Sequence, residues 1–260
     1  MATAIIEIFR VEIAKNMTEI ERYLFDLWGF IVVEDALTLE QVSALNEAIA
    51  HQVNQFNASP EQLFIRFNHL LPFGEPFLHL IDNPRVTPYL LELLGDKFRL
   101  DHEYAHILRP GCRDTDSVIH GGGTPFDPCQ YYHYQSGRMY NGLTAIAYNL
   151  TDVLPGEGGF GYIPGSHKSN LSLPKELAYL DLPHPCLQAL PVKAGSAIIF
   201  TEALTHGTLP WTGQSDRRTL FYKYSPYPSA WYRIYYNPDD YPQLTESQRA
   251  LLRPPGFYPY

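Results

Sequence analysis

The sequence predicts a mainly β fold: a double-stranded β-helix, or jelly roll, flanked by N-terminal helices. Apolar residues recur at helical spacing in much of the first 97 residues, and they alternate with polar residues in the segments that follow. The alternating segments are short, and connections rich in Gly and Pro separate them. There are 22 prolines in 260 residues, which suits a loop-rich β fold better than a helical bundle.

The composition argues against several classes of function. Lys and Arg number 19 against 28 Asp and Glu, a formal net charge of −9, so we expect no surface for nucleic acid or anionic membranes. No apolar run approaches the roughly 20 residues of a membrane-spanning helix, and the N-terminus lacks the pattern of a signal peptide. The three cysteines form no CxxC pair, which favours the reducing cytoplasm. We therefore expect a cytoplasmic protein whose partner is a small molecule.

The N-terminal part is predicted to be mostly helical. Residues 18–28 have helical apolar spacing and stop at a glycine, after which residues 30–33 form a short strand. Thr38 followed by Gln41 is a capping-box pattern that begins a second helix. Residues 84–94 are predicted to form a third helix, which also ends at a glycine.

From residue 98 onward the pattern is that of short strands. The expected strands are 98–108, 143–150, 159–163, 188–192, 196–201 and 218–224. We predict one domain over residues 1–260, with a helical flank at about 1–97, a jelly-roll core at about 98–226 and a wrapping tail at 227–260.

Groups that can bind a metal or an anion lie at the ends of two predicted core strands. His206 follows the apolar run 196–201, so its imidazole is expected at the end of a rigid element. Arg217, eleven positions after His206, and the adjacent Arg218 open the last core strand. A cation at the start of a core strand needs an anionic partner, and a carboxylate-bearing ligand is one candidate. A structural salt bridge is the alternative for whichever arginine points outward.

A glycine-rich motif occupies residues 158–168 (GGFGYIPGSHK). Its glycines predict a tight bend between strands. His167 lies in the turn that closes the motif, so we expect a structural role for it and not metal binding.

In their order and spacing these motifs resemble the phytanoyl-CoA dioxygenase family of Fe(II)- and 2-oxoglutarate-dependent oxygenases. Residues 149–153 (NLTDV) followed by the glycine-rich motif are similar to the family's central signature, and residues 29–38 are similar to its N-terminal strand and helix. The resemblance implies Fe(II) as cofactor, with 2-oxoglutarate and O2 as cosubstrates. It also implies that His206 is the distal metal ligand and that Arg217, or the adjacent Arg218, binds the 2-oxoglutarate carboxylate.

The proximal metal ligands depart from the family's pattern. The family has a His-x-Asp motif just after the strand that ends in Pro-Gly, and this sequence has residues 119–125 (IHGGGTP) there. His120 matches the histidine, while Gly122 stands where the aspartate is expected. His133 is the rival proximal ligand, also without a nearby carboxylate. We favour His120 because it follows the Pro-Gly strand end, which makes His120 and His206 the catalytic metal ligands.

The third metal ligand is left open by the sequence. A non-haem Fe(II) oxygenase normally uses two histidines and one carboxylate. Glu202, four residues before His206, is the first candidate, because a buried carboxylate is costly unless it is paired or bound to metal. Its alternative role is a salt bridge to one of the arginines. Asp127 is the second candidate, and water or halide at the vacancy left by Gly122, as in related halogenases, is the third.

The resulting hypothesis is a dioxygenase that hydroxylates or oxidatively dealkylates a small polar metabolite, such as an amino-acid conjugate or a natural-product intermediate. Polar residues between the proximal ligand and the central strand are candidates for the substrate pocket. They include His133, Arg138, Tyr140 and Asn141. The alternatives are a non-catalytic cupin-like jelly roll that binds a metal or ligand, and a 2-oxoglutarate-dependent halogenase.

Overall fold

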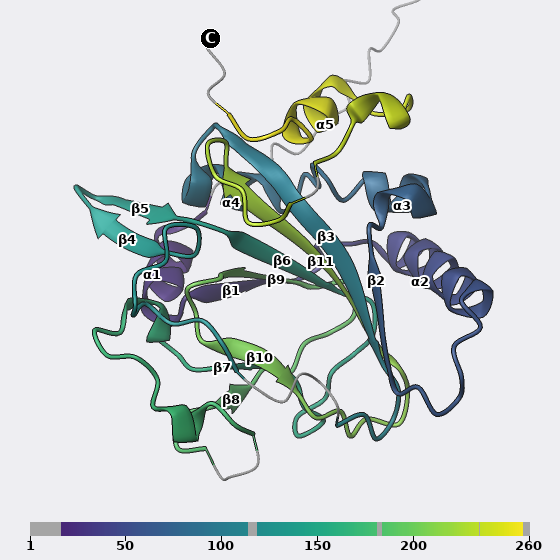
Figure 1. Cartoon of the computed structure of the whole chain (residues 1–260), viewed down its shortest axis with the longest axis horizontal. Helices are drawn as coiled ribbons and strands as arrows, with labels where there is room; N and C mark the ends of the chain where they lie inside the picture. Colours follow the sequence, from purple (N-terminus) through teal and green to yellow (C-terminus); the bar gives the residue numbers. More distant parts are fainter. Residues whose placement is uncertain (1–16, 114–118, 181–183, 234, 257–260) are drawn as a thin grey trace, which may run out of the picture.

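A computed structural model describes residues 17–113, 119–180, 184–233 and 235–256, and their strands form three antiparallel sheets (Figure 1). The six-stranded sheet contains, in order across it, β1 (Phe30–Val33), β9 (Ala197–Thr201), β6 (Thr144–Asn149), β11 (Arg217–Pro226), β3 (Phe98–Leu108) and β2 (Phe64–Asn68). The three-stranded sheet contains β10 (His206–Leu209), β7 (Gly159–Tyr162) and β8 (Gln188–Ala189). A separate hairpin consists of β4 (Tyr132–Gln135) and β5 (Arg138–Asn141).

The helices lie mainly in the N-terminal part of the chain. They are α1 (Glu19–Trp28), α2 (Leu39–Gln55), α3 (Glu75–Leu78), α4 (Thr87–Leu94) and α5 (Glu246–Leu251), with short 3-10 helices η1 (Leu71–Phe73), η2 (Ser166–Lys168), η3 (Lys175–Leu177) and η4 (Pro238–Asp240). The predicted capping box that begins α2 is present, with reciprocal bonds between Thr38 and Gln41. Among the described residues, no helix has both the length and the apolar character that crossing a membrane requires.

Two apolar clusters cover the two faces of the six-stranded sheet. The outer cluster joins the sheet to the helices, and there the hydroxyls of Tyr222 and Tyr224 donate to backbone carbonyls of the α3 region. The inner cluster lies between the six-stranded and three-stranded sheets and includes Phe160, Phe200 and Phe221. Because side chains alternate along a strand, β11 sends Tyr222 and Tyr224 outward and Phe221 inward. The inner layer is the one that contains the candidate site.

The predicted helical flank also contributes both edges of the main sheet. β1, which was expected, pairs with β9, and β2, which was not expected, pairs with β3. The segment Phe64–Asn68 has only five residues, with Arg66 and Asn68 among them, and so it lacks a long apolar run. The expected strand at 188–192 is shorter than predicted: β8 ends at Ala189, and Val192 forms only an isolated bridge with Val153.

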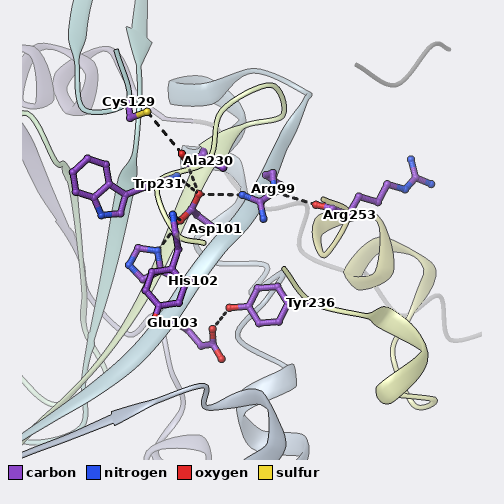
Figure 2. Close-up of polar contacts among 11 residues, drawn as sticks. Arg99, Asp101, His102, Glu103, Cys129, Ala230, Trp231, Tyr236 and Arg253 are labelled. Carbon is purple, nitrogen blue, oxygen red and sulfur yellow. Dashed lines mark hydrogen bonds and ion pairs between the residues drawn. The ribbon is translucent and has the colours of Figure 1, made fainter. Parts of the chain in front are cut away.

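The tail after β11 is attached to the sheet at a β-bulge in β3. Lys223 of β11 faces His102 and Tyr224 faces Leu100, which leaves Asp101 as the extra residue. Figure 2 shows the Asp101 carboxylate at the centre of a buried polar network. Its donors are the Arg99 guanidinium (3.0 Å), His102 Nδ1 (2.7 Å), Ser225 Oγ (3.2 Å) and the backbone amides of Trp231 (2.9 Å) and Tyr232 (3.0 Å). One carboxylate therefore holds the tail against the sheet.

Two further contacts extend this attachment along the tail. Arg99 Nε donates to the carbonyl of Arg253 at 3.0 Å, and the Tyr236 hydroxyl donates to the buried carboxylate of Glu103 (Figure 2). Glu103 also accepts the backbone amides of Leu70 and Leu71. These contacts join the described part of the tail to β3 and to the segment before α3.

Replacing Asp101 with alanine is expected to lower the free energy of unfolding by about 3 kcal/mol, because removing one partner of a buried ion pair leaves the other charge uncompensated. Urea denaturation measures this loss, and limited proteolysis should cut the tail faster than in wild type. Asp239→Ala is the matched control, since the ion pair between Asp239 and Arg249 is solvent-exposed and its loss should cost about 0.5 kcal/mol or less. Equal losses in the two variants would contradict the anchoring role of Asp101.

Candidate active site

A cavity of ≈ 120 Å³ lies within the inner layer. Phe64, Phe160 and Phe221 supply part of its apolar wall. Its polar lining consists of Arg66, Tyr104, His106, His120, His206 and Arg217. The cavity therefore brings together imidazoles and a buried arginine from strands that are far apart in the sequence.

His120 and His206 are held side by side by their own backbones. Each donates its amide to the carbonyl of the other, at 2.9 Å and 2.8 Å, and their ring centroids are 4.4 Å apart. His206 is buried, whereas His120 is exposed at the mouth of the cavity. The rival His133 lies on the exposed hairpin strand β4 and does not line this cavity. The structure thus places His120, and not His133, beside His206.

The run of glycines after His120 is explained by close backbone packing. Gly121 has φ +89°, and a Cβ there would lie 2.3 Å from the carbonyl oxygen of Leu204. The Gly122 amide donates to the carbonyl of Ala203 at 2.8 Å, and a Cβ on Gly123 would lie 2.6 Å from the carbonyl oxygen of His167. Only glycine allows so close an approach. The loop after His120 is therefore packed directly against the turn that follows β9.

That turn carries Glu202 into the inner layer. Inward positions alternate along β9, so Glu202 follows Ile198 and Phe200 on the same face, and its side chain is buried. Glu202 Oε2 lies 3.9 Å from His206 Nε2. The carboxylate that the sequence places four residues before His206 therefore does face the histidine pair.

The hydrogen bonds of His206 determine which ring nitrogen faces Glu202 as an acceptor. Nδ1 is 2.7 Å from the carbonyl of Leu204 and donates to it, which leaves Nε2 with its lone pair. Burial, together with repulsion from His120, lowers the pKa of His206 to about 3, so the ring is neutral at pH 7. A neutral imidazole nitrogen and a carboxylate oxygen, both acceptors, thus face each other in a buried place. A cation between them would satisfy both.

Lys223 binds the other oxygen of the same carboxylate. Its Nζ is 2.8 Å from Glu202 Oε1, and both side chains are buried. Burial is the largest single influence and raises the pKa of Glu202, but Lys223, His206 and His120 together outweigh it and lower this pKa to about 2. The predicted salt bridge of Glu202 exists, with a lysine in place of an arginine. In the part of the chain that the structure describes, no three His, Cys, Asp or Glu side chains are already close enough together to hold a metal ion.

Arg217 projects into the cavity as a buried cation. Its side chain is 2% exposed, and among the described residues Nε and Nη1 have no hydrogen-bond partner. Burial lowers the pKa of Arg217 to about 10, which still leaves it charged at pH 7. Gly159 of the glycine-rich motif leaves room for the guanidinium, since a Cβ there would lie 3.3 Å from Arg217 Nε. A buried charge of this kind needs an anion.

Two more polar side chains near Arg217 lack partners in the described structure. Thr219 of β11 is directly opposite His106 of β3, and the Thr219 hydroxyl and both ring nitrogens of His106 make no hydrogen bond there. Burial and the nearby Arg66 and Arg217 charges lower the pKa of His106 well below its usual value, so its ring is neutral. Donors of this kind suit a ligand with several carboxylate oxygens.

Arg218, the other arginine of the predicted clamp, points away from the cavity. Its Nη1 donates to the carbonyl and side-chain oxygens of Asn46, both at 3.2 Å, and its Nη2 lies 3.5 Å from Asp216. Neighbouring residues of a strand face opposite sides, so Arg217 and Arg218 cannot both face the inner layer. Of the two alternatives, Arg217 is the one that lines the cavity.

The predicted substrate-binding residues also lie elsewhere. His133, Arg138 and Tyr140 are exposed on the β4–β5 hairpin. Asn141, the last residue of β5, is buried and donates to the carbonyl of Leu93. None of these four lines the cavity with His120 and His206. This segment pairs with itself as a hairpin and does not fold over the cavity, which is the physical reason for the correction.

The remaining candidates make local contacts. Asp127 Oδ1 accepts the backbone amides of Cys129 and Gln130, as in a turn. His167, expected to be structural, is buried and bonds through Nε2 to the carbonyl of Asp26 at 3.0 Å. Sequence reasoning missed His106, Thr219 and Lys223. The signal that could have found them is the alternation along β3 and β11, where they share the inward face with Arg217.

Part of the chain matches a known protein family. Residues 115–219 match the model of the family described as phytanoyl-CoA dioxygenase (PhyH). The predicted resemblance to the PhyH family is confirmed. No curated protein sequence matches the chain.

Similar solved structures extend the match over most of the chain. HygX from Streptomyces hygroscopicus with nickel and 2-oxoglutarate bound has a TM-score of 0.76 at 23% identity, covering 83% of this chain and 90% of HygX. A HygX structure that also contains hygromycin B has a TM-score of 0.71 at 22% identity, with the same coverage. SnoK, a non-haem α-ketoglutarate-dependent carbocyclase from nogalamycin biosynthesis, has a TM-score of 0.61 at 17% identity, covering 83% of this chain and 86% of SnoK. These likenesses confirm the predicted fold class.

Gly121→Ala is expected to disrupt the candidate site, because the added Cβ would clash with the Leu204 carbonyl. Gly111→Ala is the matched control: Gly111 has a similar φ, +82°, but open space around its Cβ position. The control should lose only the roughly 1–2 kcal/mol of left-handed strain, and Gly121→Ala should lose more, measured by urea denaturation. Nickel titration should show weakened binding in Gly121→Ala alone. Similar losses in both variants would show that packing against the 202–204 turn is unimportant.

Proposed function

We propose that this chain is an Fe(II)- and 2-oxoglutarate-dependent dioxygenase that hydroxylates or oxidatively dealkylates a small polar metabolite. The observation that carries the proposal is that a place for a cation and a place for an anion adjoin the same cavity, which His206 and Arg217 both line. His206 and Glu202 present opposed acceptors that suit a cation, and Arg217 presents a buried positive charge that suits an anion. The PhyH match, and the metal and 2-oxoglutarate bound in HygX, support the same pair of ligands.

The donor set fits iron. His120, His206 and Glu202 would hold the metal, which gives the two histidines and one carboxylate that non-haem iron oxygenases use. Fe(II) held there together with 2-oxoglutarate would supply the activation of O2, with one oxygen atom going to succinate as CO2 is lost and the other going to the substrate. The Nδ1–H bond from His206 to the Leu204 carbonyl keeps the ring in the tautomer whose Nε2 can bind metal. Glu202 takes the place of the aspartate that Gly122 replaces.

The cosubstrate would be held by the cations and hydroxyl of the inner layer. Arg217 supplies two unpartnered N–H groups for the distal carboxylate of 2-oxoglutarate, and Thr219 and His106 supply further donors beside it. Phe160 and Phe221 line the same cavity and would exclude water from the reacting atoms. The protein's contribution is therefore orientation of the cosubstrate and a dry setting for the reaction.

The substrate would reach the site on the side where the cavity meets solvent. His120 and Arg66 both line the cavity and are exposed, so the opening is polar and carries a positive charge. This favours a polar molecule, and HygX, a protein of similar fold, has been solved with hygromycin B bound. We therefore propose a small polar metabolite as the substrate and these two residues as the rim of the opening.

A halogenase in which halide takes the third position has less support from the described residues. Gly122 has φ +118°, and its amide bonds to Ala203. Glu202 already faces His206, so a carboxylate is present where the halogenase reading needs a vacancy. A chloride requirement for succinate formation, together with a chlorinated product, would favour the halogenase over the dioxygenase.

The metal site can be tested by adding Fe(II) and 2-oxoglutarate to metal-free protein without O2. Wild type should show the weak visible charge-transfer band of a chelated complex, and His120→Ala should lose it. His133→Ala is the matched control and should keep the band, because His133 lies on an exposed hairpin outside the cavity. Metal binding without a band, or a band that persists in His120→Ala, would favour the non-catalytic cupin-like alternative or a different ligand set.

Binding of 2-oxoglutarate by Arg217 can be tested by replacing Arg217 and the adjacent Arg218 in separate variants. Arg217→Gln should weaken 2-oxoglutarate binding by about 10- to 100-fold, because charge-assisted hydrogen bonds contribute roughly 1.5–3 kcal/mol. Arg218→Gln should leave the affinity within about twofold, since Arg218 bonds to Asn46 on the outer face. The affinities follow from titrating 2-oxoglutarate into the anaerobic Fe(II) protein. A larger loss in Arg218→Gln than in Arg217→Gln would overturn the assignment.

A further inference from the structure

Lys223 is a buried lysine that points into the inner layer beside the candidate metal ligands. It lies on β11 two positions after Phe221, on the same inward face. Its Nζ is 2.8 Å from Glu202 Oε1 and 5.3 Å from the centre of the Tyr104 ring. His102, held by Asp101, is directly opposite it on β3. Lys223 is thus fixed from several sides and does not reach solvent freely.

The two oxygens of Glu202 have different neighbours. Oε1 is paired with Lys223, and Oε2 faces His206 Nε2 at 3.9 Å. Lys223 Nζ, at 2.8 Å, is the charged group that holds Oε1 and with it the orientation of the carboxylate. A metal ion could bind Oε2 while the ion pair at Oε1 stays intact. The lysine therefore acts on the carboxylate from the side away from the histidines.

Stability alone does not account for this pair. A buried lysine and a buried carboxylate each lose several kcal/mol of hydration, and their attraction repays this only with good geometry. The 2.8 Å contact between Lys223 Nζ and Glu202 Oε1 is a close ion pair between two buried side chains. Apolar residues of similar volume would fill the same space at no greater cost. A role in holding a ligand explains why both charges are placed here.

We propose that Lys223 is a positioning residue for Glu202, an inference that rests on the proposed iron site. By pairing with Oε1 it keeps Oε2 directed toward His206 Nε2, so that the carboxylate four residues before the distal histidine serves as the third metal ligand. Outer groups that orient metal ligands typically contribute 10- to 100-fold to metal affinity. Lys223 touches neither the metal nor the cosubstrate in this role and acts only through Glu202.

The test is titration of nickel(II) into the metal-free full chain, with affinity as the readout. Lys223→Met should weaken nickel binding by about 10- to 100-fold, and Lys223→Arg, which keeps the charge, should recover part of the loss. Lys168→Met is the matched control, because the ion pair between Lys168 and Asp26 is solvent-exposed and away from the cavity. It should bind nickel as wild type does.

A double-mutant cycle separates positioning from a general effect on the fold. Glu202→Gln should weaken nickel binding, and adding Lys223→Met to that variant should change it no further, because the lysine acts through the carboxylate. The same loss in both backgrounds would overturn the proposal. So would wild-type affinity, or tighter binding, in Lys223→Met, since the lysine would then be a bystander or a competitor of the metal.

Two outcomes of the nickel titration distinguish failure of the inference from failure of the proposed function. Wild type that binds nickel in a His120-dependent way, with no effect of Lys223→Met, leaves the metal site standing and removes the role of Lys223. Wild type that binds no nickel overturns both. If Lys223→Met does not fold, Lys223→Arg and Lys223→Gln are compared, and equal nickel affinity in these two variants and wild type contradicts the proposal.

Discussion

The inner face of β11 carries two buried cations, Arg217 and Lys223. The chemistry of the cavity depends on which anionic group pairs with each of them. Lys223 Nζ pairs with a group of the protein itself, Oε1 of the Glu202 carboxylate, at 2.8 Å. The Nε and Nη1 atoms of Arg217 find no partner among the described residues, although its charge is just as buried. A buried cation without a partner is costly. The same strand therefore provides one charge that pairs with the protein's own carboxylate and one that, in the proposed function, pairs with a bound anion.

Close backbone packing explains how a glycine can stand where the family has an aspartate. The loop after His120 is pressed against the 202–204 turn, so that even a methyl group on Gly121 would overlap the Leu204 carbonyl oxygen. With the two backbones in contact, a carboxylate can come from the turn as readily as from the loop. Glu202 lies on that turn and faces His206 at 3.9 Å. In the proposed function, the residue at 202 therefore supplies the carboxylate that Gly122 lacks.

Much of the architecture follows from local patterns, and the rest depends on pairing that no local pattern contains. Capping at Thr38, the stop at Gly29 and the alternation of β3 were all readable, as were His206 and Arg217 at strand ends. Choosing between Arg217 and Arg218 requires knowing which face of β11 points inward, and the sequence alone does not show this. The hairpin that removes His133 from the site, and the opposition of Thr219 and His106, follow from pairing between strands. Such register is set by long-range contacts.

The charges of the cavity link the two ligands of the proposed function. Arg66 and Arg217 line the cavity, the Lys223–Glu202 pair beside it adds no net charge, and His206 is neutral, so the surroundings are net positive. A divalent cation adds to this positive charge in a place of low dielectric, where repulsion is strong. A dianion such as 2-oxoglutarate, bound at Arg217, cancels the added charge. Each ligand should therefore bind more tightly when the other is present, and by linkage the two effects are equal in size. The buried charge of Arg217 therefore favours binding of the metal and the cosubstrate together.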